Sequence, residues 1–450
     1  MDVVEHESKI VYLVKEGSNL TIKTSVVINE VTYYPPPREN LPFSCIPKAD
    51  KVIKYYESDV DSILYSDLID YHKNISELPS PVHYDLLTLW DFLTYLIESV
   101  QYLPYMWLYA IPERGKSRTG KGCIYVSYRG IHVESLREAY LLRASTDLNA
   151  TIFFDVMNLT KKAEQSGSDD ILLQRFEKGL KVPRVLFPDR GPHLDTVYYD
   201  IYGSTIIATN EPVHEILETR ALMISMQETS KKYENDVRPQ GGLILKERLL
   251  AFRARHLGEK LPDVQKPVKG RLGDIVKPLL QIIKLVKPDR EDAFLDLIRK
   301  IEKERKEHKS ESLEAILITA IMDLEYSVKD GLLSIKSITD RANKDVKDKY
   351  HTTTRRAGWR LKALGFEKRK LSDGSYIQWD DSLIKKLKEQ YGLNTEKTGE
   401  RSGEIKRQKS HKRHMSKFST RWTSPGLLDR FRGTIGSNRG GVYVEREVHR

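Results

Sequence analysis

Three short apolar segments, each followed by polar residues, constrain the fold of this chain more than any other feature. They are residues 106–111, 150–154 and 204–208, and long helix-like or loop-like stretches separate them. Strands joined by such long crossovers pair in parallel, with helices packed on the faces of the sheet. The sequence therefore predicts an α/β fold with a parallel sheet.

The first segment leads into residues 110–117 (AIPERGKS), which match a relaxed phosphate-loop pattern with alanine in place of the first glycine. In such a loop, backbone N–H groups surround phosphate oxygens, the lysine reaches the β- and γ-phosphates, and the serine hydroxyl binds Mg²⁺. We expect Gly115, Lys116 and Ser117 to bind ATP, with Ser117 as a Mg²⁺ ligand. The alternative is an ordinary basic turn, because residues 118–122 are poor helix formers.

The other two segments end in residues that suit the same chemistry. Asp155 follows one strand, at the edge where α/β sheets place their ligands, and a carboxylate there can hold Mg²⁺. Asn210 follows the other strand and can orient a water molecule for attack on a phosphate. Arg220 precedes a further apolar strand and can meet the charge that develops during phosphoryl transfer. The alternative for Asp155 is that it only caps its strand.

The order of these motifs resembles the AAA+ branch of P-loop ATPases. More narrowly, it is similar to the helicase-like ATPases of mobile elements and to primase–helicase proteins. Residues 198–210 (YYDIYGSTIIATN) and 270–280 (GRLGDIVKPLL) carry this resemblance, which covers about residues 80–290.

The resemblance implies a role for each residue singled out above. The roles are phosphate and Mg²⁺ binding by Lys116 and Ser117, a metal-associated acid at Asp155, a sensor at Asn210, and a finger or sensor arginine at Arg220. The resemblance also implies a homo-oligomeric ring such as a hexamer, in which Arg220 acts across a subunit boundary.

One position departs from that pattern. The acid that polarises water in such ATPases normally follows the aspartate, whereas position 156 is valine. A positioned general base typically contributes 10²–10⁴-fold to a rate. Either another carboxylate (Glu113, Glu164 or Glu211) supplies this function, or turnover is slow. The open alternatives are an ATP-gated DNA-binding regulator and a DNA-binding protein with a vestigial phosphate loop.

Regions outside the core have their own signals. Alternating residues at 9–34, stopped by prolines 35–37, predict strands. We expect a β-rich module over 1–75, the ATPase core over 76–255, and a helical extension and linker over 256–308. The lysine- and glutamate-rich residues 302–312 are expected to form an exposed linker.

A compact module is expected over 309–392. Its predicted elements are helices near 313–324, 335–344 and 353–364 and a hairpin at 366–379. Three helices followed by a basic hairpin resemble a winged helix, whose third helix enters the major groove while the wing contacts phosphates. The expected DNA-binding residues are Arg355, Arg356, Arg360 and Lys362 on the third helix and Lys368, Arg369 and Lys370 on the hairpin. The alternative is a protein-binding winged helix with solvated charges.

The net charge supports DNA binding only locally. Residues 395–450 carry +8 of the total of +10, so the rest of the chain is almost neutral. The tail at 393–450 has few apolar residues and is expected to be disordered in isolation. It either adds non-specific phosphate binding or has no role.

Composition also excludes several classes of protein. No apolar run approaches the roughly 18 residues that span a bilayer, and the N-terminus lacks the basic-then-apolar order of a secretory signal. Cys45 and Cys123 are the only cysteines, which excludes a disulfide framework and a four-cysteine zinc site. We therefore expect a soluble cytoplasmic protein without membrane partners. The function that these features favour is a DNA-associated ATPase, such as a helicase or replication motor of a mobile element.

Overall fold

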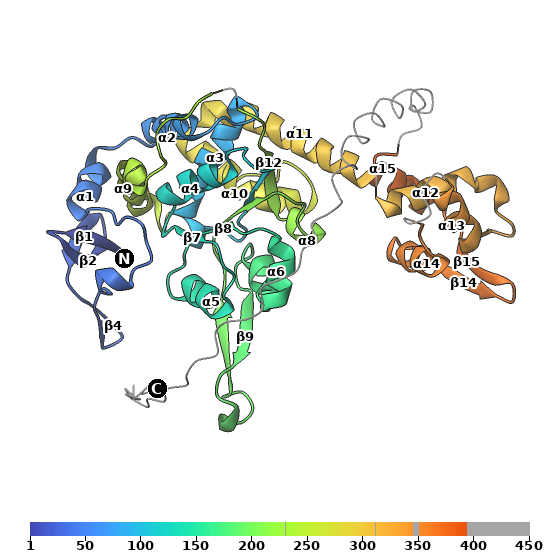
Figure 1. The fold of residues 1–450 in the computed structure, drawn as a ribbon, viewed down its shortest axis with the longest axis horizontal. Helices are drawn as coiled ribbons and strands as arrows, with labels where there is room; N and C mark the ends of the chain where they lie inside the picture. The colour runs from blue at the N-terminus through green and yellow to red at the C-terminus, as the bar shows by residue number, and fades with distance from the viewer. Residues whose placement is uncertain (230, 311, 345–350, 394–450) are drawn as a thin grey trace, which may run out of the picture. The chain divides into compact units, whose positions relative to one another are not determined.

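The structure is a computed structural model that describes residues 1–229, 231–310, 312–344 and 351–393 (Figure 1). The described residues divide into two compact units, with the boundary between residues 309 and 310. The tail predicted over 393–450 lies outside the described residues except for its first residue. Among the described residues, no helix is both long enough and apolar enough to cross a membrane.

The first unit begins with antiparallel strands, as the alternation at 9–34 predicts. The strands are β1 (Asp2–His6), β2 (Lys9–Glu16) and β3 (Asn19–Lys23) in one sheet, and β4 (Val26–Ile28) and β5 (Val31–Tyr33) in a separate hairpin. Strand β1 was not predicted. The last strand ends just before the prolines, which cannot donate to a β-ladder.

The last part of the predicted β-rich module, from residue 49 onward, is helical. Residues 49–75 form α1 (Ala49–Ser58) and α2 (Asp61–Ile75), which pack against α3 (Pro81–Thr94) and α9 (Pro239–His256). On α9, Arg248 donates hydrogen bonds to Asp59 and Asp67 at 2.8 and 2.5 Å. Residues 49–75 therefore belong to the helical layer around the core.

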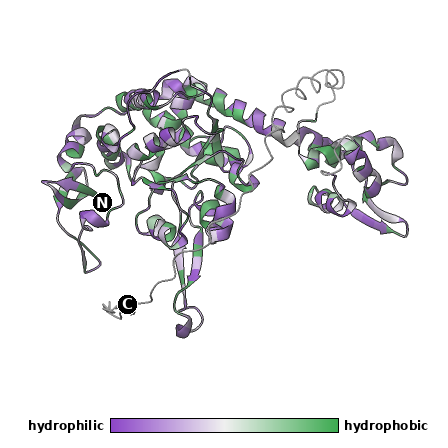
Figure 2. Cartoon of the chain, in the orientation of Figure 1, coloured by the Kyte–Doolittle hydropathy of each residue, from purple (hydrophilic) through white to green (hydrophobic). Residues whose placement is uncertain are grey.

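A parallel five-stranded sheet lies at the centre of the unit, in the order β12-β6-β11-β8-β7. Its strands are β6 (Tyr105–Tyr109), β7 (Ile131–Val133), β8 (Ile152–Asp155), β11 (Thr205–Thr209) and β12 (Ala221–Ser225). The three apolar segments supply β6, β8 and β11, so the predicted parallel α/β sheet is confirmed. Hydrophobic residues concentrate on these central strands (Figure 2).

Helices cover the sheet. They are α4 (Lys116–Val126), α5 (Glu138–Thr146), α6 (Leu159–Ser166), α7 (Asp169–Gln174), α8 (Glu215–Glu218), α10 (Gly270–Val286) and α11 (Glu291–Ser310), together with α3 and α9. The predicted linker at 302–312 is helical over most of its length, because α11 continues to Ser310. Lysine and glutamate at i,i+4 spacing support a helix, and Lys306 pairs with Glu302 at 3.0 Å.

A β-hairpin projects from this unit between β8 and β11 (Figure 1). It consists of β9 (Lys181–Val185) and β10 (Thr196–Asp200). The fully buried Arg175 lies at its base and donates hydrogen bonds to the carbonyls of Ala150 and Ile201, at 2.7 and 3.2 Å. The Arg175 carbonyl accepts from the Gly203 N–H at 3.0 Å. The chain therefore leaves the core and returns to it at the same place.

The second unit has its own hydrophobic core, which includes Ile318, Ile338, Leu361 and Ile377. Its elements are α12 (Leu313–Asp323), β13 (Leu332–Ser334), α13 (Ile335–Asn343), α14 (Thr354–Ala363), β14 (Lys368–Leu371), β15 (Gly374–Gln378) and α15 (Asp381–Gln390). The strands form an antiparallel sheet in the order β13-β15-β14. The three predicted helices and the hairpin are confirmed, whereas β13 and α15 were not predicted.

Candidate functional site

A pocket of about 260 Å³ lies at the carboxyl edge of the central sheet. Since β6, β8 and β11 are parallel, the residues after each strand meet at this edge. The pocket is lined by Pro112, Glu113, Lys116, Ser117, Asp155, Val156, Met157, Ala208, Thr209 and Asn210. The structure thus brings together the lysine, serine, aspartate and asparagine that the sequence singled out.

The loop between β6 and α4 has an unusual backbone. Glu113 and Gly115 have φ angles of 64° and 78°, in the left-handed region, and glycine adopts that region without strain. The turn at Gly115 lets α4 begin at Lys116. The first N–H groups of this 11-residue helix have no partner within the helix, so its N-terminus favours an anion.

Lys116 is folded into the loop. Its side chain is mostly buried, and its ammonium group donates to the Ile111 carbonyl at 2.8 Å. Burial lowers the pKa of Lys116, and the nearby Asp155 carboxylate opposes that shift. The lysine is therefore held at the pocket by the loop's own backbone.

Two glycines explain why α4 forms from residues that are poor helix formers. A Cβ atom at Gly120 would lie less than 3.0 Å from the ring of Phe153 on β8. A Cβ atom at Gly122 would lie 2.5 Å from the Ile75 side chain on α2. The glycines permit α4 to pack closely against both elements, and this packing outweighs the poor propensity that favoured an ordinary turn.

Asp155 has a histidine neighbour that the sequence analysis missed. The Nε2 atom of His132, on β7, lies 3.9 Å from an oxygen of Asp155 and 3.9 Å from one of Glu134. The His132 ring stacks on Phe153, with ring centroids 4.8 Å apart. Burial lowers the pKa of His132 although both carboxylates oppose the shift. Strand β7 has only three residues, so no periodicity marks this histidine in the sequence.

Val156 leaves the usual position of the catalytic acid apolar. Its side chain is buried, with 3% exposed. Of the alternative carboxylates, Glu113 lines the pocket itself. Glu164 and Glu211 line an adjacent pocket of about 270 Å³, which shares Thr209 with the first.

The tip of β11 is fixed by hydrogen bonds. The Thr209 hydroxyl accepts from the Trp107 indole and donates to the Glu211 carbonyl, both at 2.8 Å. With the Asn158 amide nitrogen facing Glu211, that nitrogen lies 2.7 and 2.9 Å from the two carboxylate oxygens. Asn210, between these two anchored residues, is exposed and lines the pocket.

Arg220 lies at the amino edge of the sheet, where the parallel strands begin, opposite to the carboxyl edge that holds the pocket. It precedes β12, and its carbonyl accepts from the N–H of Tyr105, the first residue of β6. Its guanidinium lies 4.4 Å from the centroid of the Phe176 ring and donates to the Leu173 carbonyl. Burial is the main cause that lowers the pKa of Arg220. Within one chain, Arg220 and the pocket are therefore at different ends of the strands.

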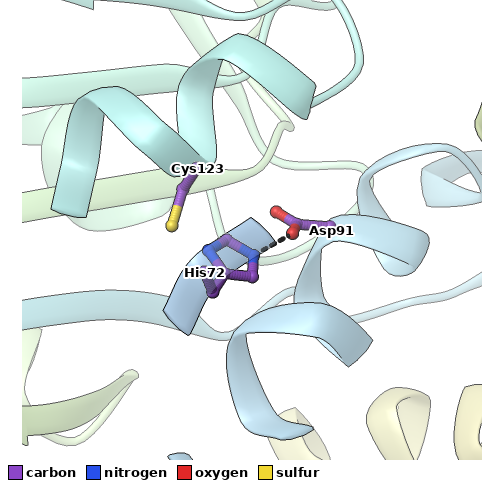
Figure 3. Close-up of side chains that lie close together, drawn as sticks. All are labelled: His72, Asp91 and Cys123. Atoms are coloured by element: carbon purple, nitrogen blue, oxygen red, sulfur yellow. Dashed lines mark hydrogen bonds and ion pairs between the residues drawn. The ribbon is translucent and has the colours of Figure 1, made fainter. Parts of the chain in front are cut away.

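Three buried side chains with metal-ligating atoms lie close together where α2, α3 and α4 meet, namely His72, Asp91 and Cys123 (Figure 3). The His72 Nε2 atom is 2.6 Å from a carboxylate oxygen of Asp91, and the Cys123 sulfur points toward the histidine ring. The other Asp91 oxygen has no hydrogen-bond partner among the described residues. Burial raises the pKa of both Asp91 and Cys123. The histidine–aspartate pair links α2 to α3 below the phosphate loop's helix.

The predicted DNA-binding residues all lie on α14 and β14 of the second unit, and all are exposed. Arg360 differs from the others, because it forms an ion pair with Glu314 of α12 at 3.1 Å. Lys368 also has a specific position, since a Cβ atom at Gly358 of α14 would lie 2.8 Å from its ammonium nitrogen. The hairpin lysine therefore rests against the third helix.

Comparisons with known proteins give weak structural similarities. No protein-family model and no curated protein matches the sequence. The structure of an active helicase, SCCmec type IV Cch, is 13% identical with a TM-score of 0.37, covering 85% of this chain and 79% of that one. The C-terminal region of NrS-1 is 11% identical with a TM-score of 0.34, covering 82% and 93%. Cdc6p from Pyrobaculum aerophilum is 12% identical with a TM-score of 0.20, covering 70% and 94%. Similarities at this level concern the fold at most.

Proposed function

We propose that this chain binds ATP and Mg²⁺ at the carboxyl edge of the central sheet and acts as a DNA-associated ATPase, such as a helicase or replication motor of a mobile element. The observation that carries the proposal is that Lys116, Ser117, Asp155 and Asn210 line one pocket. An ammonium, a hydroxyl, a carboxylate and a helix N-terminus are the groups that suit a triphosphate with its metal ion.

Each side chain has a part in this proposal. The turn at Gly115 exposes the N–H groups that begin α4 to phosphate oxygens, and Lys116 exchanges the Ile111 carbonyl for a phosphate. Ser117 and Asp155 hold the Mg²⁺ ion, which neutralises phosphate charge when bound. Asn210 orients the attacking water from the fixed tip of β11.

Slow or absent hydrolysis is the second candidate, and Val156 favours it. A buried valine cannot accept a proton from the attacking water. An ATP-gated DNA-binding regulator with little or no hydrolysis needs no acid at this position. If the chain does hydrolyse ATP, we propose Glu113 as the base, because it is the carboxylate other than Asp155 among the residues lining the pocket. The third candidate function is that of a DNA-binding protein with a vestigial phosphate loop.

We propose that Arg220 acts on a neighbouring subunit in a homo-oligomeric ring. Arg220 lies at the end of the strands opposite to the pocket of its own chain. This position favours action on the pocket of a neighbouring subunit. Mixing Arg220→Ala subunits with Lys116→Ala subunits should then restore part of the activity, because some interfaces would combine an intact pocket with an intact arginine. If mass measurements with ATP and DNA show only a monomer, this role is excluded.

We propose that the second unit is a winged helix that binds DNA, with α14 as the recognition helix and β14–β15 as the wing. Its arginines and lysines supply contacts to phosphates or base edges.

The β9–β10 hairpin of the first unit offers a further contact with nucleic acid. Its connecting loop exposes Phe187 and Leu194, and the Arg190 guanidinium lies 4.0 Å from the Phe187 ring centroid. Aromatic and arginine side chains together suit single-stranded nucleic acid.

Steady-state ATP turnover with and without single-stranded and duplex DNA tests the function. Lys116→Ala should weaken ATP binding roughly 10- to 150-fold, since a charge-assisted hydrogen bond contributes about 1.5–3 kcal/mol. Lys121→Ala, on the same helix but away from its N-terminus, is the control. Unchanged affinity in the Lys116 variant would exclude the phosphate loop.

A carboxylate variant separates the first two candidates. Glu113→Gln should reduce turnover roughly 10²–10⁴-fold while ATP still binds, if Glu113 is the base. Glu164→Gln, which changes a carboxylate of the adjacent pocket, should leave turnover close to that of the unchanged chain. No measurable turnover in the unchanged chain, together with ATP-dependent DNA affinity, would support the regulator.

A further inference from the structure

An exposed tryptophan lies among the basic residues of α14. Trp359 has 67% of its surface exposed, and no hydrogen bond or ring contact involves it within the described part of the chain. It follows Arg355 by four residues and precedes Lys362 by three, so the three side chains form one stripe along the helix. Ala357 and Leu361 turn to the core instead. The indole is therefore presented between two cations.

The surroundings of Trp359 narrow the class of ligand. A tryptophan buries roughly 150–250 Å² when it is covered, which makes it a strong anchor for a partner surface. The charges around it are positive, because Arg355, Arg356 and Lys362 are exposed on the same helix and Lys368 rests against Gly358. A ligand that fits must offer both negative charge and a flat apolar face. Nucleic acid has both.

The indole also distinguishes paired from unpaired bases. In an intact duplex the bases present only their edges in the grooves, because neighbouring base pairs cover their faces. An unpaired base exposes a face on which an aromatic side chain stacks, and arginines beside it hold the phosphates. An intact duplex offers this indole base edges and thymine methyl groups but no base face on which to stack.

We infer that Trp359 stacks on an unpaired base, so that the second unit binds DNA that carries a single-stranded segment, with Arg355 and Lys362 on the flanking phosphates. This inference rests on the proposed DNA binding of α14. It adds a substrate class, namely single-stranded or forked DNA, to the recognition of a duplex that a basic helix and wing would provide.

Two DNA probes test the inference on the full chain. One is a blunt duplex, and the other is the same duplex with a single-stranded extension that contains the fluorescent base 2-aminopurine. Trp359→Ala should bind the extended probe about 5- to 150-fold more weakly, the fold-change for stacking of about 1–3 kcal/mol per base. It should also abolish the quenching of 2-aminopurine. Affinity for the blunt duplex should change by less than about twofold.

Matched variants make the result specific. Trp359→Phe keeps an aromatic ring and should retain most of the affinity and quenching. Tyr326→Ala removes another exposed aromatic, 84% exposed and on a different element, and should change neither. The basic tail is present in every variant, so its contribution cancels in the comparison. Circular dichroism checks that the Trp359 variants remain folded.

The failure of each proposal has its own signature. Unchanged affinity and quenching in Trp359→Ala, with weaker binding to both probes in Arg355→Ala/Arg356→Ala, would overturn the stacking inference and leave DNA binding intact. Equal loss on both probes in Trp359→Ala would also overturn it, because the indole would then serve the duplex or a protein surface. Full affinity in the double arginine variant would remove the proposed DNA binding of α14 and the inference with it.

Discussion

The pocket of the first unit and the basic surface of the second are assembled in different ways. The pocket residues Lys116, Asp155 and Asn210 come from three distant stretches of sequence and meet only because three parallel strands end at one edge. The predicted DNA-binding residues of the second unit, which form its basic surface, lie within 355–370, on one helix and the hairpin that follows it. The pocket therefore depends on the packing of the whole sheet, whereas the basic surface depends on a local segment.

This difference has a consequence for substitutions. In the first unit, elements approach so closely around the pocket that small changes in volume are costly. In the second unit, exposed side chains on α14 can move without disturbing the core. Four variants examine this contrast, in order of decreasing effect.

Replacing Arg175 should have the largest effect. Arg175→Met removes the donors to the carbonyls of Ala150 and Ile201 and leaves these buried acceptors without their arginine partner. The Ser204 carbonyl also loses a donor but still accepts from the Ile152 N–H at 3.0 Å. We expect the free energy of unfolding to fall by about 3–5 kcal/mol, as for a broken buried polar network. Burial lowers the pKa of Arg175 to about 10, so the residue stays charged at neutral pH. Urea unfolding measures the change, and the exposed Lys178→Met is the control. A fall in the free energy of unfolding of less than about 1 kcal/mol would contradict the structural role given to Arg175.

Gly120→Ala should come next. The added methyl group would meet the Phe153 ring, and overpacking of this kind costs about 1–3 kcal/mol. Gly241→Ala on α9 is the matched control, because its Cβ atom would meet nothing within 4 Å. That control should gain about 0.5–1 kcal/mol from helix propensity. Thermal unfolding of the two variants should shift in opposite directions, and equal shifts would show that α4 does not press on β8.

Gly358→Ala is the corresponding change in the second unit. Here the added methyl group would lie too close only to the ammonium nitrogen of Lys368, the far end of a flexible side chain that can move away, and it would make an ordinary contact of 3.6 Å with Ile335. We expect stabilisation of about 0.5–1 kcal/mol, since alanine is the better helix former. The sign is thus opposite to that at Gly120. A clear loss of stability in chemical denaturation would mean that the position of Lys368 is rigid.

Arg360→Ala should have the smallest effect. Its ion pair with Glu314 is partly exposed, and such pairs contribute about 0.2–1 kcal/mol. Because Arg360 is engaged with Glu314, its removal should weaken DNA binding less than Arg355→Ala. Titrations of both variants at several salt concentrations compare them, and each lost phosphate contact lowers the log–log slope by about 0.9. A larger effect at Arg360 would reverse this ranking.

Sequence patterns were informative where a signal is local. The apolar segments predicted β6, β8 and β11, and local patterns predicted α12, α13 and α14 of the second unit but not α15. Strand β7 escaped prediction because three residues carry no detectable period, and His132 escaped with it. The pairing of His72 with Asp91 and the contacts of Arg175 join residues far apart in sequence, so only the folded chain reveals them. The position of Arg220 could have been predicted from the sequence, because a residue that precedes a parallel strand lies at the end of the sheet opposite to residues that follow such a strand.

The closed base of the β9–β10 hairpin has an implication for how this protein can vary. Arg175 fastens the outgoing chain to the returning chain at Ile201 and Gly203, and Phe176 and Val182 are buried in the core. Only the outer part of the hairpin, residues 186–195, therefore forms a self-contained insertion. Its length and sequence can therefore diverge between relatives, or be replaced by a short turn in an engineered version, without altering the edge of the sheet that holds the pocket. The same property makes the hairpin a suitable place for a cross-linking group or a fluorescent reporter.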